Sequence, residues 1–128
     1  MTEALDRAVD WLLERQSPEG WWTAELETNV TMTAEHVLLL RFLGADLEPV
    51  RKGAAVHLLN HQRRDGSWAL YHDGPADLST TIEAYAALKV LGIDAGREEM
   101  GRALGVIHRM GGVARARVFT KIWLAMFT

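Results

Sequence analysis

The sequence lacks cysteine entirely and has no excess of basic residues. Without cysteine the chain can form no disulfide, no thiolate-ligated zinc site and no cysteine nucleophile. Its 14 lysine and arginine residues are outnumbered by 17 aspartate and glutamate residues, which gives a formal net charge of -3. The charge balance removes the usual electrostatic basis for binding nucleic acid, and the missing cysteines suit a cytoplasmic setting.

Long hydrophobic runs are also absent. The two longest apolar stretches, 37–40 and 122–127, are far shorter than the roughly 20 residues that a membrane-spanning helix needs. The first residues mix charged with aliphatic side chains, unlike a signal peptide. We therefore expect a cytoplasmic protein, and contact with the inner surface of a membrane stays open.

What the sequence does contain is an internal repeat. Residues 7–22 align without a gap on residues 53–68. The identical positions include the pairs Ala8 and Ala54, Leu12 and Leu58, Gln16 and Gln62, Gly20 and Gly66, and Trp22 and Trp68. A fixed period of this length is typical of stacked helical units.

The spacing of apolar residues predicts helices and no convincing strand. We expect about six helices in three units, over residues 3–44, 46–92 and 94–128. The first helix is amphipathic, whereas the second and fourth, over about 32–43 and 80–91, are apolar on nearly every side. The second and fourth helices are therefore expected to be the more buried elements.

Several helix ends carry capping signals. Asp46 and Asp94 are placed to cap the third and fifth helices, and Thr80 with Glu83 has the spacing of a capping box. The sixth helix is expected to begin near Arg117 and is still apolar where the sequence stops. A repeat array normally finishes with a polar cap, so we expect either a truncated array or one that needs a partner.

The loop after the first helix of each of the first two units contains Gln, Gly and Trp in the same order. Glutamine can bind free backbone groups at a helix end, glycine allows a backbone angle that other residues resist, and tryptophan covers the loop with a flat apolar face. We interpret these residues as a structural fastener between helices. They are Gln16, Gly20, Trp22, Gln62, Gly66 and Trp68.

This Gln-x3-Gly-x-Trp pattern resembles the QW repeat of triterpene cyclases. Four strings, 26–39, 62–71, 77–85 and 117–120, together resemble the N-terminal part of bacterial squalene–hopene cyclases. The resemblance extends over essentially the whole chain but only over the first part of a full-length family member. It implies an all-α fold of the α/α-toroid type, here an incomplete barrel of helical hairpin repeats.

The resemblance also implies a reaction. In that family squalene is protonated at one end and cyclised through carbocations to hopene, an isomerisation in hopanoid and triterpenoid biosynthesis for which no cofactor is implied. The family's acid belongs to an Asp-x-Asp-Asp motif, which these 128 residues do not contain. We therefore expect an N-terminal portion that is inactive alone. It would join the missing C-terminal portion or associate with itself through its open apolar face.

Four residues are candidates for the wall of the substrate cavity or its immediate support. Glu35 and Glu83 lie at matching places near the starts of the two buried helices, where a carboxylate is costly unless paired, and Arg117 is an available partner. By resemblance, these three residues face the junction between the two domains of the cyclase. The alternative role for the two acids is capping and interaction with the helix dipole. Trp123 lies outside the repeat, on the last apolar helix.

Other functions remain open at this point. A class II diterpene cyclase shares the α/α toroid, and a non-catalytic helical module could bind an isoprenoid or a protein. The β-subunit of a protein prenyltransferase is disfavoured because its zinc needs a thiolate. The histidines indicate no metal site, since only His57 and His61 have one-turn spacing and no third ligand is evident.

Overall fold

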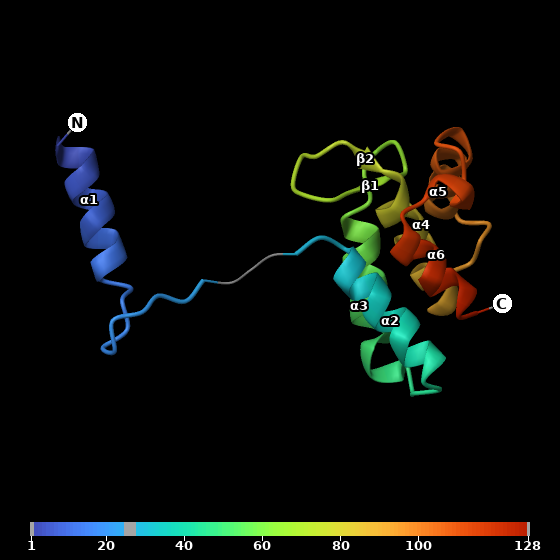
Figure 1. The fold of residues 1–128 in the computed structure, drawn as a ribbon, viewed down its shortest axis with the longest axis horizontal. Coiled ribbons are helices and arrows are strands. Elements are labelled where there is room, and N and C mark those ends of the chain that lie inside the picture. Colours follow the sequence, from blue (N-terminus) through green and yellow to red (C-terminus); the bar gives the residue numbers. More distant parts are fainter. Residues whose placement is uncertain (1, 25–27, 128) are drawn as a thin grey trace.

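The computed structural model describes residues 2–24 and 28–127, and over these residues nearly all of the regular secondary structure is helical (Figure 1). Its elements are α1 (Thr2–Leu13), α2 (Thr31–Phe42), α3 (Glu48–Asn60), β1 (Trp68–Ala69), β2 (Ala76–Asp77), α4 (Leu78–Val90), α5 (Glu98–Arg109), the 3-10 helix η1 (Val113–Arg115) and α6 (Val118–Ala125). The predicted all-α fold class is thereby confirmed. Closure of these helices into a toroid, and the boundaries of the three units, stay predictions.

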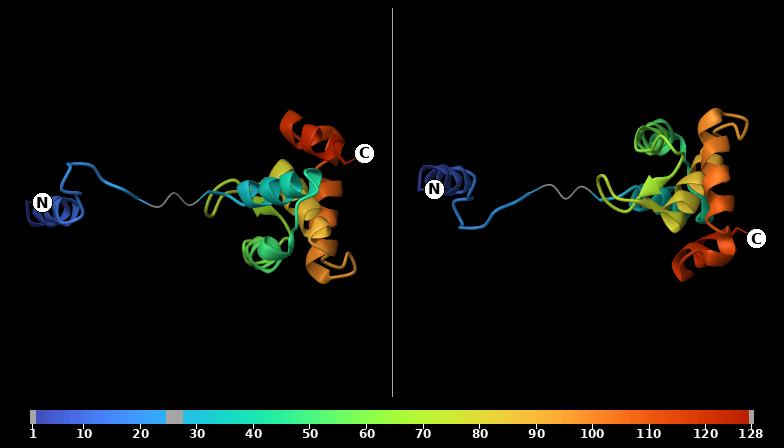
Figure 2. Two further views of the ribbon diagram at one scale, coloured as in Figure 1. Left: turned by 90° about the horizontal axis from the view of Figure 1, so that it is seen from below. Right: turned by 90° about the horizontal axis from the view of Figure 1, so that it is seen from above.

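Helix α4 is the centre of the packed helices. It contacts α2 and α5 most extensively, and α3 and α6 also pack against it (Figures 1 and 2). Most of its residues are buried, including Ala84 and Ala87, whose small side chains let neighbouring helices approach closely. The expectation of a mostly buried element is therefore correct for the fourth helix. It is wrong for the second helix, α2, in which only Ala34, Val37 and Leu38 are buried because most of its other apolar side chains face outward.

Helices α2 and α4 end in the same way. The N–H of Ala45 donates to the carbonyl oxygen of Leu40 at 2.9 Å, and the N–H of Ile93 donates to that of Leu88 at 3.0 Å. The residue between helix and loop is a glycine with positive φ in both places, +67° in the first and +83° in the second. This arrangement is the Schellman motif, in which a left-handed glycine lets the chain satisfy the last carbonyls of a helix.

The predicted capping box of the fourth helix is wrong. Helix α4 begins two residues earlier than expected, because the carboxylate of Asp77 accepts the backbone N–H of Thr80 at 2.7 Å. An aspartate in extended conformation is a strong N-cap, so it takes the role that the sequence suggested for Thr80. Glu83 consequently lies inside the helix and has no capping function.

The predicted cap of the fifth helix is also wrong. The predicted cap of the third helix, Asp46, lies one residue before the observed N-cap, Leu47. Asp94 accepts the N–H of Gly96 at 3.0 Å, in the turn before α5, and the residue directly before α5 is Arg97. Asp46 accepts the N–H of Glu48, the first residue of α3, at 3.0 Å. A short side chain can bond to a backbone N–H two residues on in a turn as readily as in a helix, and sequence spacing does not separate the two cases.

A two-residue β-ladder joins the second loop to α4, where no strand was predicted. Trp68 pairs with Asp77 and Ala69 with Ala76 in antiparallel register. The ladder is too short to have a period of its own, so apolar spacing could not reveal it. It closes the loop over 70–75 and places the cap of α4 beside the tryptophan.

Helix α1 differs from the other α-helices because none of its described residues is buried. Figure 1 shows it away from α2–α6. Its apolar stripe is therefore open, with Leu5, Leu12 and Leu13 each about half exposed or more. Among the helices of the described ranges, none has both the length and the apolarity needed to cross a membrane.

Candidate functional site

The carboxyl group of Glu83 is enclosed by the helices around α4. The residue is only 2% exposed, and its Oε1 atom accepts a hydrogen bond from the hydroxyl of Thr120 on α6, a residue that is itself fully buried. Within the described part of the chain, Oε2 of Glu83 has no hydrogen-bond partner. A carboxylate with one satisfied and one unsatisfied oxygen inside a helical core is unusual, because an unpaired buried acceptor costs free energy.

The surroundings raise the pKa of Glu83 above its ordinary value. Burial is the largest cause, because it disfavours the charged form. The hydrogen bond from Thr120 acts in the opposite direction, the nearby charge of Glu35 raises the pKa further, and that of Arg117 lowers it. A perturbed carboxyl group of this kind is a recognised sign of a functional site.

Arg117 lies beside this carboxyl group but is not its direct partner, contrary to the sequence prediction. Its guanidinium is 3.5 Å from a carboxylate oxygen of Asp77 and 3.5 Å from the hydroxyl of Thr80. Its backbone N–H donates to the hydroxyl of Ser79 at 2.9 Å. Arg117 thus joins the start of α6 to the first turn of α4, and its charge acts on Glu83 only through space.

The other two predicted residues flank this cluster. Glu35 lies on α2, is half-buried and influences the charge of Glu83, so the structure brings both acids into one electrostatic neighbourhood. Trp123 lies on α6, one turn after Thr120, and is half-buried. Residues three apart share one side of a helix, so Trp123 follows Thr120 along α6.

Two residues of this region, Thr120 and Asp77, were not among those predicted from the sequence. Thr120 lies three residues after Arg117 on a helix that is apolar apart from Thr120 and Lys121. A small polar side chain on such a helix signals a buried contact. Asp77 precedes Thr80 by three residues, which is the spacing of an N-cap. Both signals are present in the sequence, but neither says which partner the side chain meets.

The second QW motif, residues 62–68, contacts helix α5. The side-chain amide of Gln62 donates to the carbonyl oxygens of Gly66 at 3.0 Å and Glu99 at 2.8 Å, the latter in the first turn of α5. Gly66 has φ +91°, and a Cβ atom there would lie 2.5 Å from Cβ of Arg102. Only glycine allows α5 to approach this closely.

Trp68 closes the same motif from inside. It is fully buried, its indole nitrogen donates to the carbonyl oxygen of Leu58 at 2.8 Å, and its backbone N–H donates to the hydroxyl of Thr81 at 3.1 Å. The tryptophan therefore links the last turns of α3 to the first turn of α4. This contact explains why a large aromatic residue is needed at the end of the motif.

The first QW motif, residues 16–22, has the same internal bonds, but within the described ranges no neighbouring helix bonds to it. Gln16 donates to the carbonyl oxygen of Gly20 at 2.7 Å, and the indole nitrogen of Trp22 donates to that of Leu12 at 2.7 Å. Gly20 has φ +92°. Trp22 nevertheless remains 51% exposed.

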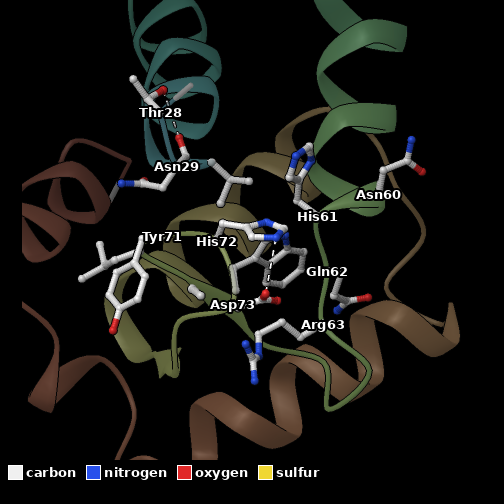
Figure 3. Close-up of a pocket in the computed structure, with 13 residues that line it drawn as sticks. Thr28, Asn29, Asn60, His61, Gln62, Arg63, Tyr71, His72 and Asp73 are labelled. Atoms are coloured by element: carbon white, nitrogen blue, oxygen red, sulfur yellow. Dashed lines mark hydrogen bonds and ion pairs between the residues drawn. The ribbon is translucent and has the colours of Figure 1, made fainter. Parts of the chain in front are cut away.

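A cavity of about 560 Å³ lies elsewhere, between the segment before α2, the end of α3 and the loop over 69–73 (Figure 3). His72 and Asp73 approach to 3.4 Å there, but both side chains are more than 90% exposed, so this ion pair is weak. Of the predicted residues, only Gln62 and Trp68 line this cavity. Glu35, Glu83 and Arg117 do not line it. These three residues and Thr120 are called the Glu83 cluster below, and the cavity is distinct from this cluster.

Comparisons with known proteins agree over the whole chain. The family model of the squalene–hopene cyclase N-terminal domain matches residues 5–128. The squalene–hopene cyclase of Alicyclobacillus acidocaldarius is 49% identical over 126 residues, which cover 95% of this chain and 19% of that protein. The squalene–hopene cyclase of Zymomonas mobilis is 41% identical over 125 residues, which cover 96% of this chain and 19% of that protein.

A plant relative is also similar. The dammaradiene synthase of Dryopteris crassirhizoma is 40% identical over 126 residues, which cover 98% of this chain and 18% of the synthase. The chain thus spans less than a fifth of the length of the curated relatives it matches.

Proposed function

The chain belongs to the squalene–hopene cyclase family, through its N-terminal domain, and we propose that it forms one wall of a terpene-cyclase cavity that takes squalene or a related isoprenoid. The observation that carries this proposal is the enclosed carboxyl group of Glu83, with Arg117 beside it, in a chain of this family. The names of the matched relatives favour a triterpene over a diterpene substrate.

The chemistry of such a cavity suits the Glu83 cluster. Cyclisation through carbocations moves positive charge across an apolar space, where a fixed carboxylate stabilises it far more than in water. Glu35 and Glu83 bring two carboxyl groups to this region and Arg117 brings the opposing charge. We assign these residues to shaping the electrostatic field of the wall, and Trp123 to its aromatic surface.

The proton that starts the reaction comes from another part of the enzyme in this proposal. The chain contains no Asp-x-Asp-Asp sequence, and Glu83 has one oxygen tied to Thr120. The isolated chain should therefore produce no hopene from squalene. Incubation of the purified chain with squalene, followed by gas chromatography, checks this expectation.

The QW motifs have a structural role in the same proposal. In the second motif, Gln62 ties the loop after α3 to the first turn of α5. The exposed apolar residues of α6, Val118, Phe119 and Ile122, are suited to pack against the remainder of a cyclase. The same exposed surface would allow self-association of an isolated chain or peripheral contact with a membrane.

A chimera tests the proposed function. We would replace the matched N-terminal segment of the A. acidocaldarius squalene–hopene cyclase by this chain and measure conversion of squalene. The chimera should cyclise squalene, and Glu83→Gln should reduce its turnover. Glu48→Gln, at an exposed glutamate of α3, should leave the turnover unchanged and serves as the control. A folded chimera that forms no cyclic product would contradict the proposal.

A further inference from the structure

We propose that Thr120 is a positioning residue for Glu83: its hydroxyl holds one carboxyl oxygen, favours the charged form of the group and fixes the direction of the other oxygen. The role of this charge in the cavity rests on the proposed function. The hydrogen bond between Thr120 and Glu83 is independent of it. It adds to the cluster a residue that sequence reasoning did not select.

The geometry of the contact allows little freedom. Thr120 and Glu83 are both buried, they lie on different helices, and the hydroxyl of Thr120 donates to Oε1 of Glu83. Threonine has a single hydroxyl proton and, inside a helix, often donates it to a backbone carbonyl three or four residues earlier. Thr120 donates it across to α4 instead, so its only proton is committed to the carboxylate.

Oε2 is the atom that this arrangement leaves available. It is buried and has no hydrogen-bond partner among the described residues. With Oε1 held by α6, rotation of the carboxylate would break a charge-assisted hydrogen bond in a medium of low polarity. The bond therefore fixes the direction in which the second oxygen points.

Charged groups on three sides act on the same carboxyl group. Glu35 on α2 and Asp77 before α4 raise its pKa, in the same direction as burial, whereas Arg117 before α6 lowers it. The side chain of Arg117 is 47% exposed and is engaged by Asp77, so solvent screens its effect. Thr120 is thus the group that contacts the carboxylate directly and favours its charged form.

The test follows the ionisation of Glu83 in the 128-residue chain without any substrate. Glutamate labelled with ¹³C at the side-chain carboxyl is titrated by NMR, and the Glu83 signal is identified by its loss in Glu83→Gln. Thr120→Val, which replaces the hydroxyl by a methyl group of similar size, should shift the titration of Glu83 to higher pH. Thr120→Ser, which keeps the hydroxyl, should leave it near the wild-type position.

Thr81→Val is the matched control. Thr81 is also a fully buried threonine, but its hydroxyl donates to the carbonyl oxygen of Asp77 and accepts from the N–H of Trp68. It should leave the Glu83 titration in place. An unchanged titration in folded Thr120→Val would overturn the proposal, as would an equal shift in Thr120→Ser. Should Thr120→Val fail to fold, the titration of Thr120→Ala decides in the same way. Because no cyclisation is measured, a negative result leaves the chimera test of the proposed function intact.

Discussion

The two QW motifs of this chain have the same conformation and very different surroundings. The side-chain amide of the glutamine reaches the carbonyl oxygen of the motif glycine at 2.7 Å in the first and 3.0 Å in the second. The indole nitrogen of the tryptophan reaches the preceding helix at 2.7 Å and 2.8 Å. The glycine φ angles are +92° and +91°. The motif therefore takes its shape from its own residues.

What differs is the contact that each motif makes beyond itself. Gln62 also binds the first turn of α5, and Gly66 lies directly against Arg102. A Cβ atom at Gly20 would instead have the amide nitrogen of Gln16, within the same motif, as its nearest neighbour at 3.9 Å. Trp68 is fully buried and Trp22 is half exposed. Conformation is thus local, whereas the stabilising effect should depend on a neighbouring helix.

The tryptophans should show the largest difference. Trp68→Ala removes a fully buried aromatic side chain and a buried hydrogen bond, and should lower the free energy of unfolding by about 3–5 kcal/mol. Trp22→Ala, at the equivalent half-exposed position, should cost less than about 1 kcal/mol. Urea denaturation followed by circular dichroism at 222 nm measures both. Equal losses would mean that burial does not separate the two motifs.

The glycines should separate the cost of backbone conformation from the cost of packing. Gly20→Ala places a side chain at positive φ without a steric clash, and should cost about 1–2 kcal/mol. Gly66→Ala has the same φ and in addition forces a methyl group to within 2.6 Å of the backbone of Arg102. The clash should raise its cost to about 2–4 kcal/mol. Thermal melting of the two variants gives the comparison, which would fail if Gly20→Ala were the less stable one.

The glutamines should differ by the bond to the next helix. Gln62→Ala removes the bonds to Gly66 and to Glu99, and should cost about 1–3 kcal/mol. Gln16→Ala removes a single bond at an exposed site and should cost about 0.5 kcal/mol. Hydrogen exchange of the first-turn amides of α5 provides a local measurement. These amides should exchange faster in Gln62→Ala and at the wild-type rate in Gln16→Ala.

Much of this fold could be predicted because it depends on local sequence. The helices follow from apolar spacing, and the Schellman ends of α2 and α4 follow from Leu-Gly pairs. The errors lie where two local signals compete, as at Asp77 and Thr80, since both residue types cap helices. A single sequence does not rank such alternatives, because neighbouring backbone decides between them.

The candidate site was predictable only in part. The matching positions of Glu35 and Glu83 on two apolar helices identified the region, and the structure places both near each other. The direct partner of Glu83 is Thr120, 37 residues later in the chain, and not Arg117. That contact depends on how α6 packs across α4. Spacing along one helix carries no information about such a crossing.

The acidic residues of the two motifs should show the smallest difference, and it should depend on pH. Asp65 accepts a hydrogen bond from the hydroxyl of Ser67 at 2.6 Å, and Glu19, at the equivalent position, accepts one from Ser17 at 2.6 Å. These bonds are the main reason why the pKa of each carboxyl group is lowered. A lowered pKa in the folded state adds stability above the unfolded value, and this stability disappears as the pH falls through the folded value.

Asp65→Asn should therefore destabilise the chain at pH 7 and have a decreasing effect as the pH falls below about 4. The loss at pH 7 should be less than about 1 kcal/mol, because the side chain is half exposed and solvent screens its interactions. Glu19→Gln should change the global unfolding transition less, since α1, the helix before the first motif, has no buried residue among those the structure describes. Urea titrations at pH 7 and pH 3 measure both variants. If the loss of stability at pH 7 relative to pH 3 were larger in Glu19→Gln than in Asp65→Asn, the first motif would be coupled to the packed helices.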